Sequence, residues 1–241
     1  MRFLVAATSL FLFSIASFAQ VTKKTLELPE FKSIYVNSNY TVYLKQTNKQ
    51  EVKVEALAEI YDATEIKVED GILMITVERK PEAPDKSLWA KIDDIKLNPT
   101  MKVYVSMKDV SVLQVNGRGK IISENSIASD DLQLGLTGSG SMDIDVKGKK
   151  LTTEISGAGA IALKGYATSN KVNLSGPVNL NAFNCELESA TVRVGGSGSA
   201  EIKVNEDLEA YVMGSGSIKH KGNTKKLTKK VYGSGTVDRA Y

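Results

Sequence analysis

Residues 132–163 read LQLGLTGSGSMDIDVKGKKLTTEISGAGAIAL, and they contain the pattern from which the fold can be predicted. Within it, two glycine motifs, Gly138-Ser139-Gly140 and Gly157-Ala158-Gly159, lie 19 residues apart. Apolar residues occupy every second position on both sides of each motif, which is the pattern of strands with one buried face. A strand pattern that recurs at a fixed interval of this length predicts the stacked coils of a solenoid.

The motif occurs seven times, at intervals of 18 to 21 residues. The other five copies are Gly117-Arg118-Gly119, Ser175-Gly176-Pro177, Gly196-Ser197-Gly198, Gly214-Ser215-Gly216 and Gly233-Ser234-Gly235. We therefore predict an all-β protein, folded as a single-stranded parallel β-helix with coils of about 19 residues. The general preference for right-handed crossover connections predicts that the β-helix is right-handed.

The alternation passes through each motif without a change of phase, so both glycines are expected to face inward. The simplest explanation is a corner too narrow for an inward side chain, where glycine also permits a positive φ. The middle residue then points outward, and one exposed corner is expected to carry Ser139, Ser197, Ser215 and Ser234. Polar turns are expected at the opposite edge, at residues 147–150, 165–170, 183–189, 205–207 and 221–226.

Residues 20–100 repeat less clearly and are expected to form an N-terminal β region, ahead of the glycine-cornered β-helix of residues 101–241. Asn37-Ser38-Asn39 has the place of a corner in a degenerate copy, and Asp70-Gly71 indicates a tight turn between strands. Residues 79–100 contain three prolines and the only tryptophan, and are predicted to form an irregular loop. The N-terminal region would be a separate β unit or a cap, because the end strands of a solenoid are otherwise unpaired edges.

Residues 1–19 have the pattern of a secretory signal peptide. Arg2 precedes an apolar run from Phe3 to Phe18, and the small residues Ser17 and Ala19 stand before the expected cleavage site. An uncleaved anchor is the alternative, but the run is short of the ~20 apolar residues of a spanning helix. After cleavage, no later segment is expected to span a membrane. We therefore predict an exported protein of the periplasm, the outer-membrane surface or the extracellular space.

The charge balance and the scarcity of cysteine and histidine argue against several classes of function. Removal of Arg2 from the 31 basic residues leaves 30 against 28 acidic ones, which gives no general attraction to nucleic acid. Aromatic residues do not alternate with the basic ones, as base stacking would require. The single cysteine and single histidine predict no disulfide framework, no zinc or iron–sulfur site, and no cofactor.

The candidate binding groups are hydroxyls, lysines and tyrosines. The serines of the exposed corner would suit a sugar or a partner backbone, although serine is also a common turn residue. A basic stretch with no acid between Glu209 and Asp238 contains six lysines: Lys219, Lys221, Lys225, Lys226, Lys229 and Lys230. It would hold an anionic glycan or a phosphate surface, or would only prevent edge-to-edge stacking of solenoids.

Aromatic side chains offer a way to discriminate between these possibilities. Sugar or protein binding is favoured if Tyr166, Tyr211, Phe183 and Trp89 share one exposed face, and is disfavoured if loops bury them.

A polysaccharide lyase or glycosidase is the enzymatic alternative, since such enzymes are also built on β-helices. Asp143, Asp145 and Glu201 lie at outward positions and would form a weak acidic patch. Lys203, however, occupies the position that corresponds to Asp145, and mixed charge of this kind is typical of an ordinary solvated surface. His220, the only histidine, is flanked by lysines and lacks the partners of a nucleophilic triad. The sequence therefore predicts no enzyme.

Three features resemble the family of the putative auto-transporter adhesin, head GIN domain, which occurs in exported proteins of Bacteroidetes. They are the segment Phe31-Lys32-Ser33-Ile34-Tyr35-Val36, the segment Asp70-Gly71-Ile72-Leu73-Met74-Ile75, and the Gly-Ser-Gly-Ser repeats. The resemblance covers roughly residues 28 to 239. It implies a non-catalytic, adhesin-like role at the cell envelope or surface, with a glycan or surface protein as partner. A structural envelope module that self-associates through its outer strands is the other alternative.

Overall fold

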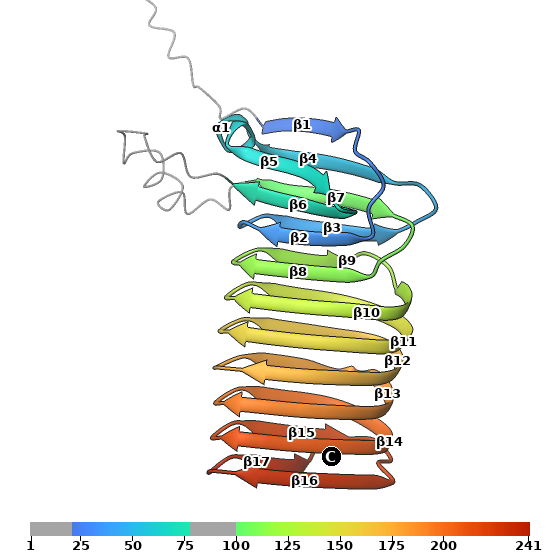
Figure 1. Ribbon diagram of the computed structural model, residues 1–241, viewed down its shortest axis with the longest axis vertical. Coiled ribbons are helices and arrows are strands. Elements are labelled where there is room, and N and C mark those ends of the chain that lie inside the picture. Colours follow the sequence, from blue (N-terminus) through green and yellow to red (C-terminus); the bar gives the residue numbers. More distant parts are fainter. Residues whose placement is uncertain (1–20, 78–99) are drawn as a thin grey trace, which may run out of the picture.

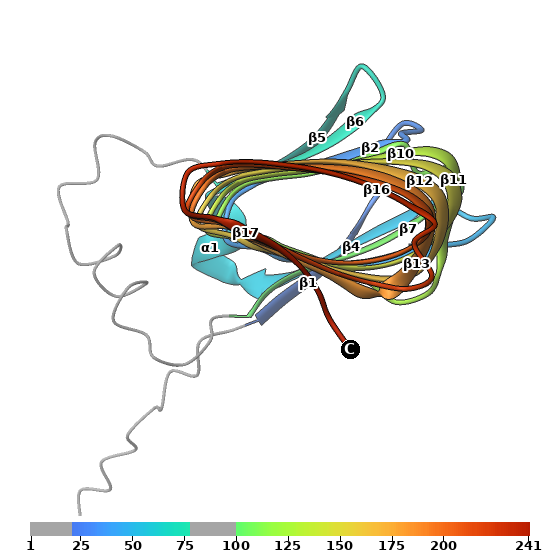
Figure 2. The ribbon, with the colours of Figure 1, turned by 90° about the horizontal axis from the view of Figure 1, so that it is seen from below.

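The computed structural model describes residues 21–77 and 100–241. The predicted signal peptide, Trp89 and all but Thr100 of the predicted loop 79–100 lie outside the described residues. The described chain is a stack of β coils along one long axis, and confirms the predicted parallel β-helix (Figure 1). It has about seven turns, and Figures 1 and 2 show that they are right-handed. Within the described ranges, no helix is both long and apolar enough to cross a membrane.

The regular coils comprise β8 to β17, each paired in parallel with the equivalent strand of the next coil. Their bounds are β8 Val112–Gly117, β9 Lys120–Ser123, β10 Ile127–Gly138, β11 Ser141–Gly157, β12 Ala160–Ser175, β13 Asn179–Gly196, β14 Ser199–Gly214, β15 Ser217–Lys221, β16 Lys226–Tyr232 and β17 Thr236–Arg239.

Each coil has two long sides, joined by a tight corner and a wide corner (Figure 2). The glycine motifs form the tight corner. We call the side that leads into the motif the front face; it contains β8 and β16 and faces the viewer in Figure 1. The side that follows the motif is the rear face, and contains β9, β15 and β17. Strands β11 to β14 begin on the rear face, bend around the wide corner and end on the front face.

The two glycines of a motif have different roles. The first has a positive φ, which is +114° at Gly138 and +104° at Gly157, and it is at least partly exposed. The second is buried: a Cβ on Gly159 would lie 2.7 Å from the carbonyl oxygen of Gly140 in the preceding coil. The expectation that both glycines face inward is therefore correct only for the second. The first is required for backbone conformation, because L residues rarely adopt this φ.

The wide corner differs from the predicted polar turns. Residues 147–150, 165–170, 183–189 and 205–207 lie inside the continuous strands β11, β12, β13 and β14. Pairing between β11 and β12 continues around the bend, whereas register shifts interrupt it between β12 and β13 and between β13 and β14. The chain remains a strand throughout, so the curvature is spread over several residues and no separate turn forms. Only the last predicted turn, residues 221–226, contains a break, since β15 ends at Lys221 and β16 begins at Lys226.

The N-terminal strands join the same stack, but not in chain order. Their bounds are β1 Val21–Leu26, β2 Ser33–Asn37, β3 Thr41–Gln46, β4 Glu51–Leu57, β5 Thr64–Glu69, β6 Ile72–Val77 and β7 Met101–Met107, with helix α1 at Ala58–Asp62. The coil of β2 and β3 lies between the coil of β6 and β7 and the coil of β8 and β9, parallel to both. Beyond β7, β4 and then β1 pair antiparallel at the N-terminal end, next to α1 (Figure 1).

Two local predictions for this region are confirmed. Asn37 ends β2 and Thr41 begins β3, so Asn37-Ser38-Asn39 lies at a corner of the coil. Asp70 and Gly71, with φ of 51° and 73°, form the tight turn between the antiparallel strands β5 and β6. Positive φ at both central residues is the requirement of a type I′ hairpin.

The core lies between the front and rear faces and consists of columns, in which each coil contributes one side chain stacked on the next. One front-face column, with every member at most 3% exposed, comprises Val115, Leu136, Ile155, Leu174, Val194 and Val212. Full burial of such a side chain stabilises the fold by about 1.5–3 kcal/mol. The apolar residues that alternate in the sequence are therefore the residues of the core.

Two neighbouring polar side chains and the single cysteine lie among these apolar columns. Thr153 and Asn170 are 0% and 1% exposed, and the Thr153 hydroxyl donates to Asn170 Oδ1 over 3.2 Å. Asn170 Nδ2 is buried and has no hydrogen-bond partner among the described residues. Burial raises the pKa of the Cys185 thiol to about 12, with smaller contributions from Asp145 and Glu186. Cys185 is therefore a protonated, unreactive core residue.

Candidate binding surfaces

The predicted serines lie where the sequence places them, on the outside of the tight corner. Ser139, Ser197, Ser215 and Ser234 are all exposed. The backbone below them is held in the stack, for example by the Ser139 N–H, which donates to Gly117 O over 2.9 Å. The last three follow one another on successive coils, about 4.8 Å apart, whereas Ala158 and Pro177 separate them from Ser139.

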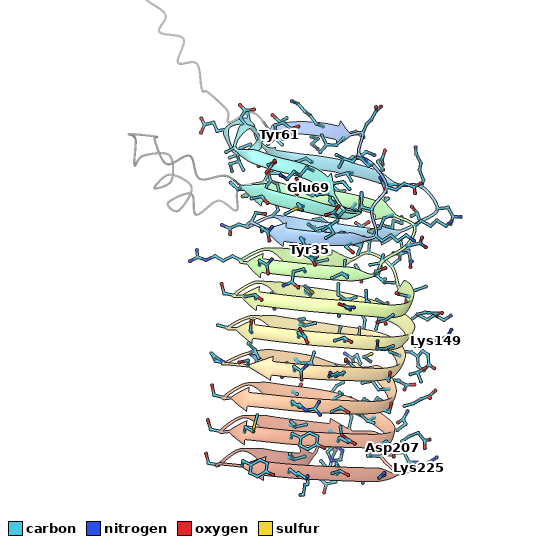
Figure 3. All side chains as sticks on the ribbon, in the orientation of Figure 1. Tyr35, Tyr61, Glu69, Lys149, Asp207 and Lys225 are labelled. Atoms are coloured by element: carbon cyan, nitrogen blue, oxygen red, sulfur yellow. The ribbon has the colours of Figure 1, made fainter. Side chains whose placement is uncertain are left out.

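The predicted lysines do not form one patch. Lys219 points outward on the rear face, and Lys221 lies over the Phe183 ring, 4.6 Å from its centroid. Lys225 forms an ion pair with Glu206 at the wide corner, with Nζ 2.7 Å from the carboxylate oxygen, and Lys226 follows at the start of β16. The wide corner carries further such pairs between coils, and Lys149, Asp207 and Lys225 project from it in Figure 3. Exposed pairs of this kind contribute little stability.

The candidate aromatic residues do not share a face. Tyr166 is at the wide corner, where its hydroxyl donates to Glu188 over 3.2 Å. Tyr211 is on the front face, with the Arg193 guanidinium 5.1 Å from its ring centroid. Phe183 is near the wide corner under Lys221. Their positions therefore give no support for a single aromatic platform.

The carboxylates of the enzymatic alternative are not paired across a cleft. Asp143 and Glu201 belong to the same outward column of the rear face, but they are three strands apart. This corresponds to about 14 Å, beyond the ~5–9.5 Å between the carboxyl groups of glycosidases. Asp145 accepts a hydrogen bond from the Ser126 hydroxyl over 2.9 Å. Among the described residues, no three His, Cys, Asp or Glu side chains are grouped to hold a metal ion.

A site that the sequence reasoning missed lies on the front face. It is a shallow depression of about 300 Å³ across β8, β10, β11 and β12, which we call the front groove. Its polar lining consists of Gln114, Thr137, Glu154, Ser156, Asn173 and Ser175. Leu136, Ile155 and Leu174 form the floor with their backbone, because their side chains point into the core.

Gly135 makes room for the Gln114 side chain in the front groove. The central column of the front groove runs Gln114, Gly135, Glu154, Asn173, and at Gly135 it lacks a side chain. The Gln114 amide lies across this position, so closely that a Cβ on Gly135 would overlap it. Gly135 has no positive φ, so its role is to leave space and not to permit a special backbone conformation.

Hydrogen bonds between side chains hold the groove lining in place. Gln114 Nε2 donates to Asn116 Oδ1, and Asn116 Nδ2 donates to Asn37 Oδ1, each over 2.8 Å. Asn173 Nδ2 donates to Glu154 Oε1 over 3.4 Å. These bonds orient amide and carboxylate groups before any ligand arrives, and this lowers the entropy lost on binding.

Aromatic and cationic groups flank the same column. Tyr35 on β2 is in register with Gln114 at one end, and Figure 3 shows it on the front face. Arg193 is in register with Asn173 at the other end, followed by Tyr211. All these residues stand three positions before the first glycine of their motif, or at the equivalent position in β2. Counting back from each glycine motif would therefore have found the column.

A second depression, of about 530 Å³, lies where several loops meet beside the Asp70-Gly71 turn. Gln50 connects these loops: its Oε1 accepts from the Phe31 N–H over 3.2 Å, and its Nε2 donates to the carbonyls of Leu28 and Pro29. Since both ends of the Gln50 amide are already bonded to backbone, this depression is explained by loop packing.

Three solved structures have a similar fold. They are a putative adhesin from Bacteroides fragilis NCTC 9343 (TM-score 0.81, 21% identity), a putative lipid binding protein from Parabacteroides distasonis ATCC 8503 (0.71, 20%) and a putative adhesin from Parabacteroides merdae ATCC 43184 (0.68, 19%). In each case 92% of this chain and 97% of the other chain are covered. At this identity the likeness establishes the fold alone.

No curated protein matches the sequence. The model of one family matches residues 30–224. This stretch includes the segments that begin at Phe31 and Asp70 and the Gly-Ser-Gly-Ser repeats, which carry the resemblance described above. The chain therefore belongs to the family of the putative auto-transporter adhesin, head GIN domain.

Proposed function

We propose that the protein is a non-catalytic, adhesin-like binding protein that holds an extended glycan along the front groove. The observation that carries this proposal is the set of oriented polar side chains around Gly135, flanked by Tyr35 and by Arg193 with Tyr211. Amide, carboxylate and hydroxyl groups together match the mixed donors and acceptors of sugar hydroxyls. The two tyrosines supply amphipathic surface at either end of the column.

The shape of the surface supports an extended ligand. The front face is built from in-register parallel strands, so the groups of the central column recur about every 4.8 Å along the solenoid axis. A polymer with repeated hydroxyl groups can meet several of them at once. The description of the family agrees with a binding role.

Removal of two groove side chains is expected to weaken glycan binding. The double variant Glu154→Ala/Asn173→Ala loses one charged and one neutral hydrogen-bonding group, and we expect affinity to fall about 10- to 100-fold. The measurement is binding of the purified protein to an array of bacterial and host polysaccharides, followed by titration of the best-bound polysaccharide.

The rear face offers a matched control, Asn181→Ala/Glu201→Ala, which removes the same two residue types from outward positions on β13 and β14. This variant is expected to bind like the unaltered protein. Equal loss in both double variants, or no polysaccharide bound by the unaltered protein, would contradict the front groove as a glycan site. In the second case a protein partner or a structural role would be favoured.

We also infer that the protein is exported and displayed outside the cell, which an adhesin-like role requires. The sequence pattern of residues 1–19 and the family name support this inference. Protease added to intact cells is expected to cleave the protein while a periplasmic control protein survives. Protection of the chain until the outer membrane is opened would contradict surface display.

A further inference from the structure

Three basic side chains occupy core positions at the C-terminal end of the described stack. On the rear face, Ile202 of β14 is followed in register by His220 of β15 and Arg239 of β17. On the front face, Ala210 of β14 is followed by Lys229 of β16. The column of Ile202 therefore continues with a histidine and then an arginine, and the column of Ala210 continues with a lysine.

His220 is the buried member of this group. It is 6% exposed, and its Nδ1 has no hydrogen-bond partner within the described part of the chain. A buried polar nitrogen without a partner is unfavourable, so a ligand that accepts its hydrogen bond would be stabilised here. Arg239 and Lys229 are exposed and provide access from solvent.

The surroundings of His220 are net cationic. Burial is the main cause that lowers its pKa, and the positive charges of Arg239 and Lys229 lower the pKa further. The negative charge of Asp238 raises the pKa of His220. Asp238 is in register with Lys219, however, and both belong to an outward column of the rear face. The remaining neighbour in register, Ile202 of β14, carries no charge.

The arginine is held in place. Arg239 Nη2 donates to the carbonyl oxygen of Gly222 over 3.3 Å. This bond uses one of the five N–H groups of the guanidinium, and the planar fork that remains suits the oxygens of phosphate.

Apolar side chains flank Lys229 on the same side of β16. Leu227 and Val231, in register with the buried Leu208 and Val212 of β14, are 42% and 39% exposed. In the described structure β16 pairs with β14, and β17 with β15. Exposed apolar side chains beside cations are typical of surfaces that meet the headgroups of a lipid layer.

We propose that His220 Nδ1, Lys229 Nζ and the Arg239 guanidinium form a binding site for a phosphate group, separate from the front groove. Three donors that come from three strands fit a tetrahedral oxyanion better than a planar carboxylate. Phosphate also carries enough negative charge to balance the two permanent cations. The group is free phosphate or belongs to a lipid headgroup, and the exposed apolar side chains beside Lys229 favour the headgroup.

The single histidine makes a direct test possible. The mature protein without a histidine tag has one imidazole, whose proton resonances and pKa can be followed by NMR. Bound phosphate stabilises the charged imidazolium, so inorganic phosphate at constant ionic strength is expected to shift the resonances saturably and to raise the pKa of His220. Equal amounts of chloride are expected to do neither.

Arg239→Gln and Lys229→Met are each expected to lower the affinity for inorganic phosphate, measured from the saturable shift, at least 10-fold. The control Lys171→Met, which changes an exposed lysine of β12, is expected to leave this affinity unchanged. Lys229→Met is expected to keep the thermal unfolding midpoint, because it replaces a core-column charge by an apolar chain of similar length. No saturable shift, or a shift that persists in both Arg239→Gln and Lys229→Met, would overturn the proposal.

Vesicles distinguish the two sources of phosphate. Sedimentation with phosphatidylglycerol vesicles, lost in Arg239→Gln and absent with phosphatidylcholine, would assign the site to an anionic headgroup. A phosphate response without vesicle binding would assign it to soluble phosphate.

Discussion

Gly157→Ala is expected to lower the free energy of unfolding by about 3 kcal/mol or more. Two effects add at this position. The φ of +104° is one that residues with a Cβ rarely adopt, which costs about 1–3 kcal/mol. The added Cβ would also lie 2.6 Å from the carbonyl oxygen and 3.0 Å from the nitrogen of Gly138 in the preceding coil. Because these are backbone atoms of a paired strand, relief requires the coils to separate, and overpacking of this kind costs about 1–3 kcal/mol.

The measurement is chemical denaturation followed by circular dichroism. The adjacent residue provides the control, because Ala158→Ser introduces the side chain that four other motifs carry at the same exposed position. We expect Ala158→Ser to change the free energy of unfolding by less than about 0.5 kcal/mol. A Gly157→Ala protein as stable as Ala158→Ser would show that the tight corner does not depend on the first glycine.

The double variant Thr153→Val/Asn170→Leu is expected to raise the free energy of unfolding by about 1–3 kcal/mol. The change removes the buried Asn170 Nδ2 that lacks a partner, and replaces both members of the Thr153–Asn170 hydrogen bond at once. Replacement of both partners avoids an unpaired hydroxyl, and the removal of an unsatisfied buried group recovers its desolvation penalty.

The neighbouring coils show that the new side chains suit these columns. Leu151 lies next to position 170, and Leu134 and Val172 lie on either side of position 153. Asn181→Leu, at an exposed position of the rear face, is the matched control and is expected to change stability by less than about 0.5 kcal/mol. A double variant less stable than the unaltered protein would indicate that the Asn170 amide has a partner in solution, such as a buried water.

Much of the fold was predictable because its signals are local. The alternation on either side of Gly138 and Gly157 specifies strands with one buried face, and each glycine motif marks a corner. Both features depend on residues within a few positions of each other. The wide corner was predicted wrongly for a related reason: Lys147 to Lys150 look like a turn, but pairing with the neighbouring coils keeps them in the strand.

The candidate sites were less accessible to sequence reasoning. Ser139 and its equivalents were found because they belong to the glycine motif itself. The front groove was missed because Gln114, Gly135, Glu154 and Asn173 come from four different coils and differ in chemistry. Nothing local in the sequence joins them until the register of the coils is known.

Local sequence patterns are enough to specify that this chain forms a parallel β-helix, where its tight corners lie, and which side chains enter the core. Period-two alternation and the conformational freedom of glycine are properties of short segments, and they act in the same way wherever the segment lies. The pairing between coils, which the tertiary structure alone reveals, inserts the coil of β2 and β3 between those of β6–β7 and β8–β9. It also brings His220, Lys229 and Arg239 to the same end of the stack. These arrangements depend on which strand pairs with which across the stack, and hydrogen bonds between distant segments select that pairing.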